Sequence, residues 1–112
     1  MMMRIDAIWL AGEPVDMRAG MDTLLGRVVH VFGSAQPHQA YCFTNHSVTR
    51  MKVLMHDGVG VWLSSRRLNR GKFVWAGSEM GKVASIDAEQ WQALVLGLPW
   101  QRVGRAGAIT VV

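Results

Sequence analysis

Cysteine is almost missing from this sequence, with Cys42 as the single example among 112 residues. One cysteine excludes an internal disulfide and any zinc site built from cysteine ligands, and it fits a reducing compartment. Proline is also scarce, with three residues, and charged residues make up 18%, below the roughly 25% that is usual for soluble domains. Both shortages argue against intrinsic disorder. We therefore expect a folded, cytoplasmic protein.

Long apolar runs and targeting signals are lacking as well. The longest uncharged stretch, residues 28–49, contains several His, Gln and Asn residues and Pro37. It therefore cannot be a membrane span, which needs ~20 mainly apolar residues. The first ten residues lack the basic segment, the apolar run and the cleavage site of a signal peptide. We expect a protein that is neither exported nor bound to a membrane.

Apolar side chains, by contrast, are abundant. Half of the residues are hydrophobic, and they include five Trp and eight Met. A chain of this length lies within the usual range for one domain and can bury a core without disulfides. We predict a single domain over residues 1–112, with residues 1–4 and 103–112 frayed at its two ends.

Apolar residues at helical spacing predict two helices. The first has Asp16 as its expected N-cap and Gly33 as its stop, and its apolar stripe consists of Met21, Leu24, Leu25, Val28 and Phe32. The second begins at a capping box formed by Asp87 and Gln90 and ends near Gly97. Three side chains of the second helix are expected to pack on a sheet: Trp91, Leu94 and Leu98.

Short runs of aromatic and β-branched residues predict the strands. These runs cover residues 5–11, 40–43, 51–56 and 59–65, and residues 73–75 are a candidate for a further strand. Asp57-Gly58 between two such runs is a strong hairpin signal. The predicted fold is α+β, in the order β-α-β-β-β-α, with an antiparallel sheet and a central β-hairpin packed against two helices.

Side-chain alternation divides this hairpin into two faces. One face carries Arg50, Lys52, Leu54, His56, Val61, Leu63 and Arg67. The other face carries Met51, Val53, Met55, Trp62 and Arg66, and we expect it to face the core.

Catalytic and metal-binding patterns do not emerge from the sequence. Several acidic residues already have structural roles as caps or turns, and the four His residues show no metal-ligand spacing. Cys42, between Tyr41 and Phe43, is expected to be buried and unreactive. The Gly58-Val59-Gly60 run lacks the third glycine and the helix of a phosphate loop, so we interpret it as a turn. We expect no enzyme activity, no cofactor and no metal.

Basic residues are unevenly distributed along the chain. Residues 50–82 hold seven of the twelve basic and two of the eight acidic residues, which gives a local charge of +5 against −1 elsewhere. Such a field suggests a polyanionic partner. The candidate nucleic-acid-binding residues are Arg50, Lys52, Arg67, Arg70 and Lys72. The alternative is a solvated rim that protects a sheet edge. Trp62 and Trp75 could stack on bases, although such residues are more often core.

Five stretches of the sequence carry a family resemblance, namely residues 16–22, 50–54, 57–63, 67–75 and 87–100. The most specific are Asp-Met-Arg-Ala-Gly at residues 16–20 and the run from 57 to 75. Over about residues 9–100 the chain resembles the TnpB accessory proteins of the IS66 family of bacterial insertion sequences. These proteins are encoded by the second reading frame, beside a separate transposase. The chain differs from the family pattern in two places. Residues 44–49 do not form the strongly basic loop of the family, and His56 stands where the family has an aromatic residue.

The resemblance implies a non-enzymatic accessory role in DNA transposition and recombination. The expected partners are DNA, the transposase of the same element, or both. A protein-interaction module without DNA contact is the main alternative, and a metal-dependent nuclease is a less favoured one. The oligomeric state stays open.

Overall fold

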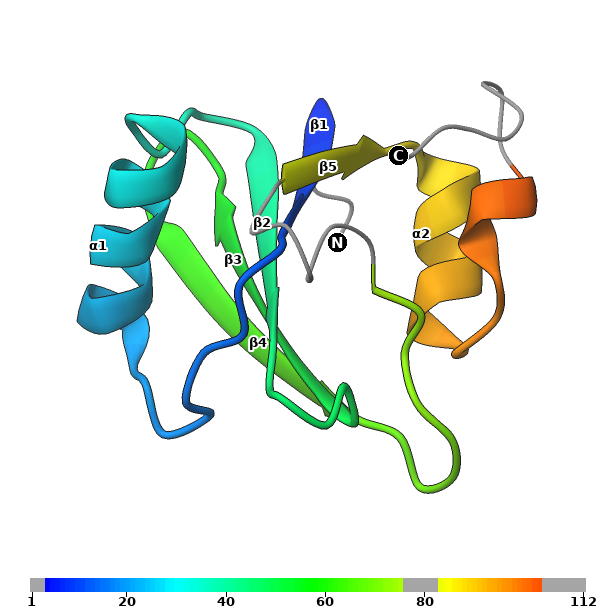
Figure 1. Ribbon diagram of the computed structural model, residues 1–112. Coiled ribbons are helices and arrows are strands. Elements are labelled where there is room, and N and C mark those ends of the chain that lie inside the picture. The colour runs from blue at the N-terminus through cyan, green and yellow to red at the C-terminus, as the bar shows by residue number, and fades with distance from the viewer. Residues whose placement is uncertain (1–3, 76–82, 104–112) are drawn as a thin grey trace.

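The computed structural model describes residues 4–75 and 83–103. Within these residues the chain forms a five-stranded sheet in the order β4-β3-β2-β1-β5, with one helix against each face (Figure 1). The strands are β1 (Ala7–Ala11), β2 (Gln39–Thr44), β3 (Arg50–His56), β4 (Val61–Arg67) and β5 (Val83–Ile86). The helices are α1 (Met21–Phe32) and α2 (Ala88–Val95), followed by the short 3-10 helix η2 (Trp100–Arg102). The predicted α+β class fits this architecture.

The sheet is mixed, so the prediction of an antiparallel sheet is only partly right. β1 and β2 run parallel, with Ala7 opposite Gln39, whereas the other three strand pairs are antiparallel. A parallel pair needs a connection of a dozen or more residues, usually through a helix. α1 supplies this connection, and the strand-helix-strand order already contained the signal.

The core lies on both faces of the sheet. On one face Leu24 and Val28 of α1 join Tyr41, Phe43 and Leu54 in a buried cluster. A second cluster on the opposite face is formed mainly by Leu10, Cys42, Met51, Val53, Leu94 and Trp100. The hairpin parity is confirmed by the β3–β4 register, but the expectation of a single core face is wrong. β2 is buried along almost its whole length, as is usual for a strand covered on both sides.

The start of α1 differs from the prediction. The helix begins at Met21 with Gly20 as its N-cap, and no side chain caps it. Asp16 instead accepts hydrogen bonds from the backbone and the guanidinium of Arg18, so it stabilises the preceding turn. The predicted stop at Gly33 is confirmed.

The capping box at the start of α2 is confirmed. The Asp87 carboxylate accepts from the Gln90 amide at 2.8 Å, and the Gln90 side chain accepts from the Asp87 amide at 3.0 Å. Leu94 is fully buried, as expected. Leu98, however, is 50% exposed, because the helix ends at Val95 and the chain turns at Gly97 with φ +76°.

Residues 73–75 do not form the expected strand. Phe73 is buried, the Trp75 indole donates to the Ala11 carbonyl at 2.7 Å, and the Val74 carbonyl accepts from the Trp100 indole at 2.6 Å. The apolar residues 73–75 therefore hold this segment against the core through side-chain and backbone contacts, and they do not pair as a strand. β5, which no sequence pattern indicated, is an additional strand that pairs antiparallel with β1. Most of the two predicted frayed ends lie outside the described residues.

Candidate nucleic-acid interface

The β3–β4 hairpin places Arg50 directly opposite Arg67 on neighbouring strands. Both are exposed and lie on the face of the sheet that α1 covers, together with Lys52. They lie where β3 starts and β4 ends, opposite the turn at residues 57–60. We call this end of the molecule the basic end. Its members are Arg50, Lys52, Arg66, Arg67, Arg70 and Lys72.

Lys52 is less free than its position in the sequence suggests. Its ammonium group donates to the Ala19 carbonyl at 2.7 Å and thereby ties β3 to the segment that leads into α1. The side chain is half-buried. Lys52 therefore contributes positive charge and also a structural bond, which no sequence pattern indicated.

Arg66 projects from the opposite face, as the parity predicts. Its Nε donates to the Val95 carbonyl at 2.7 Å, at the last residue of α2. A cation at this position satisfies a terminal carbonyl and complements the helix dipole. Arg66 nevertheless borders the same surface depression as Arg50, Lys52 and Arg67, a hollow of about 520 Å³. Arg66 therefore lies beside the other cations of the basic end although it projects from the opposite face of the sheet.

Arg70 and Lys72 lie on the exposed segment that follows β4. Backbone bonds at both sides of this segment fix it to the loop before β3. Leu68 donates to the Thr49 carbonyl at 3.1 Å, and Phe73 donates to the Val48 carbonyl at 2.7 Å. These bonds bring Arg70 and Lys72 to the same end of the sheet as Arg50. Lys82, which also counts toward the local charge of +5, lies outside the described residues.

Among the described residues, the acidic side chains at this end form their ion pairs with other cations than the six of the basic end. The Asp16 carboxylate pairs with Arg18 at 2.7 Å, which lowers the pKa of Asp16 to about 2. Glu13 pairs with Arg27 at 3.2 Å, and Asp22 lies in the first turn of α1, where negative charge favours the helix. Across residues 4–75 and 83–103, no ion pair involves a member of the basic end.

The opposite end of the sheet is acidic, and its turn is closed by hydrogen bonds. The Asp57 carboxylate accepts from the amides of Val59 and Gly60 and from the Trp62 indole, at 2.6 to 2.8 Å. The bond from Gly60, followed by those from Trp62 and Val59, lowers the pKa of Asp57 to about 2. Because these amides are already engaged, the turn has none to offer a phosphate, in line with its interpretation as a hairpin. The four carboxylates of this acidic end belong to Asp6, Asp57, Asp87 and Glu89.

The two tryptophans considered for base stacking lie at different ends of the sheet. Trp75 is half-buried and held by its bond to Ala11. Trp62 is 46% exposed, but it lies at the start of β4 and is bonded to Asp57 at the acidic end. Trp62 therefore offers the basic end no aromatic platform, whereas Trp75 lies at the same end of the sheet as Arg50 with its indole N–H engaged.

The described part of the chain contains no candidate metal centre, and its cysteine is unreactive. No three His, Cys, Asp or Glu side chains there are grouped so that they could hold a metal ion. Cys42 is completely buried in β2, and this burial raises the pKa of its thiol well above the ordinary value. Thiolate chemistry at Cys42 is accordingly suppressed.

A small α+β scaffold with one strongly basic end is thus the class of protein that the geometry defines. Comparison with protein families then gives a match to the IS66 Orf2-like family over residues 6–105. This chain belongs to that family, which confirms the resemblance found in the sequence. The family consists of accessory proteins of insertion sequences and is not a known family of enzymes.

Two relatives come from Sinorhizobium fredii (strain NBRC 101917 / NGR234), and both carry the description of uncharacterized proteins. The protein y4hO is 35% identical over 95 residues, which cover 84% of this chain and 82% of the relative. The protein y4jC is 35% identical over 103 residues, which cover 88% of this chain and 84% of the relative. No solved structure matches the chain. The helices among the described residues are all too short or too polar to cross a membrane.

Proposed function

We propose that this protein is a non-enzymatic accessory factor of insertion-sequence transposition that binds DNA through its basic end. The observation that carries the proposal is the direct opposition of Arg50 and Arg67 on neighbouring strands without an acidic partner. Like charges directly opposite each other destabilise a sheet. A polyanion that binds between them removes this repulsion, so the arrangement favours a phosphate backbone as the ligand.

The chemistry of the basic end favours phosphate contacts over contacts with bases. Arginine and lysine side chains dominate it, and they bind the DNA backbone irrespective of sequence. Single-strand binders add aromatic side chains on which bases stack, whereas Trp62 lies at the far end of β4. We therefore propose duplex DNA as the ligand, with Arg50, Lys52, Arg67, Arg70 and Lys72 as the contacting residues.

The test is a titration of a fluorescent DNA duplex at several salt concentrations, read by anisotropy. Each phosphate contact contributes about 0.9 to the slope of log affinity against log salt. We expect Arg50→Ala and Arg67→Ala each to reduce this slope by about 1 and to weaken binding to all sequences alike. Arg4→Ala is the matched control, because it removes the same charge beside Asp6 at the acidic end.

Equal affinity for the DNA duplex in the parent, Arg50→Ala and Arg67→Ala would contradict DNA binding through the basic end. In that case the basic end would be a docking surface for an acidic face of the transposase, the alternative function. A pull-down of purified transposase with the parent and with Arg67→Ala identifies this outcome. Magnesium-dependent or manganese-dependent nicking by the pure protein would instead favour the nuclease alternative and contradict the non-enzymatic role.

A further inference from the structure

β4 is the outermost strand of the sheet, and β3 pairs with it on one side only. At the two ends of this hairpin, Asp57 donates to the Gly60 carbonyl and Leu68 donates to the Thr49 carbonyl. Because hydrogen-bonded and non-hydrogen-bonded pairs alternate along an antiparallel ladder, the even-numbered residues of β4 bond to β3. The backbone groups that point outward from the edge therefore belong to Val61, Leu63, Ser65 and Arg67.

This edge has little of the protection that exposed edge strands usually carry. Edge strands are commonly short, or they carry proline, bulges or charges that prevent pairing with another chain. β4 has seven residues without proline, its register with β3 has no bulge, and only Arg66 and Arg67 at its end are charged. Across residues 4–75 and 83–103, no group bonds to the outward backbone of β4. The strand is therefore an open template for a further strand.

From this geometry we infer that a second copy of the protein pairs its own β4 with this edge, antiparallel and with a two-fold axis at Ser64. The register pairs all seven residues of both strands. It also joins outward-pointing residues with outward-pointing residues, as an antiparallel ladder requires. Such an interface is self-complementary, because the same patch serves both copies. The two basic ends then lie at opposite ends of the paired strands.

The two arginines of β4 select this antiparallel arrangement. In a parallel pair, Arg66 and Arg67 would lie beside the same arginines of the second copy, and like charges side by side destabilise a sheet. In the antiparallel pair, Arg66 lies opposite Trp62 of the second copy and Arg67 lies opposite Val61. Trp62 is half-exposed, and a guanidinium over an indole ring is a favourable cation–π contact. Arg66 uses its Nε for the bond to the Val95 carbonyl and keeps its planar face for the ring.

Exposed apolar side chains lie next to both ends of β4. Leu96 and Leu98 are exposed, and Gly97 between them packs against the side chain of Leu68, directly after β4. Val59, in the turn before β4, is almost fully exposed. The antiparallel register carries Val59 of one copy toward the end of β4 in the other, where Leu96 and Leu98 lie. Burial of these side chains adds a hydrophobic contribution to the backbone bonds of the interface.

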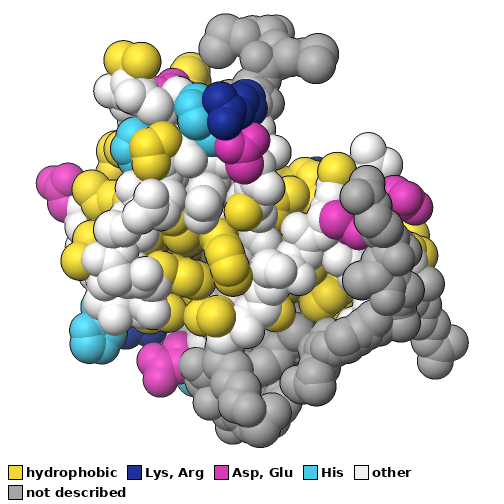
Figure 2. Space-filling view, turned by 90° about the horizontal axis from the view of Figure 1, so that it is seen from above, with side chains coloured by type: hydrophobic (Ala, Val, Ile, Leu, Met, Phe, Trp, Pro, Cys, Tyr) yellow, Lys and Arg dark blue, Asp and Glu magenta, His cyan; other side chains and the backbone are white. Residues whose placement is uncertain are grey.

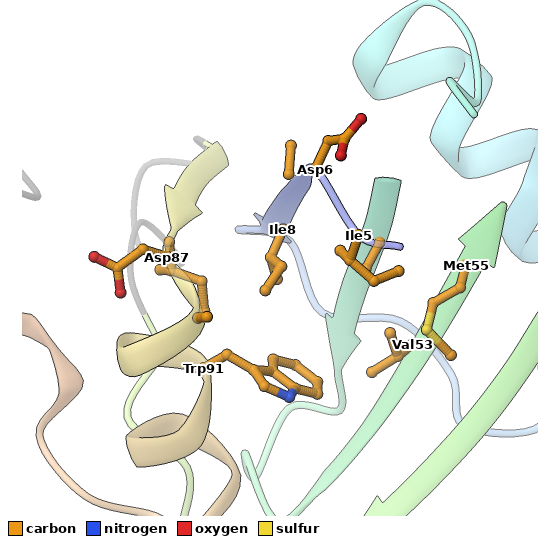
Figure 3. A pocket seen from close by; sticks show the side chains of 11 residues that line it. Ile5, Asp6, Ile8, Val53, Met55, Asp87 and Trp91 are labelled. Carbon is orange, nitrogen blue, oxygen red and sulfur yellow. The ribbon is translucent and has the colours of Figure 1, made fainter. Parts of the chain in front are cut away.

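A cavity at the acidic end is a second apolar surface that could attract another copy. It has a volume of about 340 Å³ and lies between α2 and the strands β1, β3 and β5. Figure 3 shows Ile8 and Trp91 directed into this space, and Figure 2, which looks onto this end, shows hydrophobic side chains in a hollow. The described lining of the cavity includes no residue of β4. The two surfaces can therefore be tested separately.

The experiment measures the mass of the full-length protein by sedimentation equilibrium, without DNA and over a wide range of concentrations. We expect a concentration-dependent dimer in the parent. Ser64→Glu and Ser64→Lys each place like charges across the two-fold axis, and we expect each to weaken the dimer at least about fivefold. An equimolar mixture of the two variants should form the dimer again, because opposite charges then face each other. Thr23→Glu, at an exposed position of α1, and Ala88→Trp, on the rim of the cavity, are controls that should dimerise like the parent.

Cross-linking locates the two-fold axis. In the proposed register Ser64 faces Ser64 of the second copy in a non-hydrogen-bonded pair, with Cα atoms within the roughly 4.4–6.8 Å that a disulfide spans. Ser64→Cys should therefore form a disulfide-linked dimer with oxidised glutathione, whereas Ser65→Cys, which lies opposite Leu63, should not. Cys42 is completely buried and does not interfere. Non-reducing electrophoresis shows the difference, and circular dichroism checks that each variant keeps the fold.

Several outcomes would overturn the inference. A parent that is monomeric at every concentration, or a Ser64→Glu variant that dimerises like the parent, would contradict pairing through β4. Equal cross-linking of the two cysteine variants would contradict the register, and a dimer lost only in Ala88→Trp would place the contact at the cavity. A monomeric parent that binds purified transposase, with this binding lost in Ser64→Glu, would show that a strand of the transposase pairs with β4 instead. None of these measurements uses DNA, so this inference and the proposed function fail separately.

Discussion

The two ends of the sheet differ in how their polar groups are satisfied. At the acidic end the Asp57 carboxylate accepts three hydrogen bonds, and Asp87 closes a capping box with Gln90. At the basic end Arg50 and Arg67 face each other with no ion pair among the described residues. The carboxylates of Asp57 and Asp87 therefore stabilise a hairpin turn and the start of α2 through hydrogen bonds.

This difference distinguishes groups that stabilise the fold from groups that are available for a ligand. Polar groups with internal partners contribute to folding, whereas like charges in direct opposition reduce stability. Lys52 and Arg66 show that the distinction is made residue by residue, since both lie at the basic end and both donate to backbone carbonyls. The remaining cations are those expected to contribute most to binding.

The largest expected effect comes from the helix that links the two ends. α2 begins at the acidic end and finishes beside Arg66, and Leu94 in its middle is fully buried. We expect Leu94→Ala to lower the free energy of unfolding by about 2–5 kcal/mol, because it leaves a cavity in the core. Urea unfolding followed by circular dichroism measures the change.

Leu98→Ala serves as the control for this substitution. Leu98 is half exposed, and we expect its removal to change stability by no more than about 0.5 kcal/mol. Equal losses in the two variants would show that α2 does not hold the ends together through Leu94.

A smaller effect concerns pH and compares one aspartate from each end. The pKa of Asp57 is lowered from 3.8 to about 2 in the folded chain. Its stabilisation is therefore complete above about pH 4 and disappears as the pH falls through the folded pKa. We expect Asp57→Asn to lower the melting temperature at pH 7, and the difference from the parent to shrink between pH 4 and pH 2.

Asp16 has a pKa lowered to about 2 as well, but mainly through the exposed side chain of Arg18. Asp16→Asn should therefore change the melting temperature at pH 7 less than Asp57→Asn does. A larger effect of Asp16→Asn would mean that exposed ion pairs at the basic end stabilise the fold more than the bonded turn does.

The smallest expected effect separates two neighbouring arginines. Arg66→Ala removes the bond to the Val95 carbonyl at the end of α2, and we expect a loss of about 0.3–1 kcal/mol in stability. Arg67→Ala relieves the repulsion with Arg50 and should leave stability unchanged or slightly higher. Thermal unfolding at low salt measures the stability of both variants. A larger loss in Arg67→Ala than in Arg66→Ala would show that Arg67, and not Arg66, stabilises the fold.

Local patterns in the sequence determined the parts of the fold that depend on near neighbours. The Asp87–Gln90 capping box, the Asp57-Gly58 turn and the parity of the hairpin all involve residues close in the chain, and all are confirmed. The cluster of basic residues could also be predicted, because the hairpin register follows from the turn. These features need only local geometry and side-chain alternation.

Contacts between distant segments were decided only by the tertiary structure. β5 is a short strand with Ala and Ser, and its pairing with β1 joins residues more than 70 positions apart. The bonds from Lys52 to Ala19 and from Arg66 to Val95 join segments that only the folded sheet brings together. The apolar cavity likewise combines residues from β1, β3, β5 and α2. Sequence patterns report which side chains avoid water, but the partner of each side chain depends on how the layers pack.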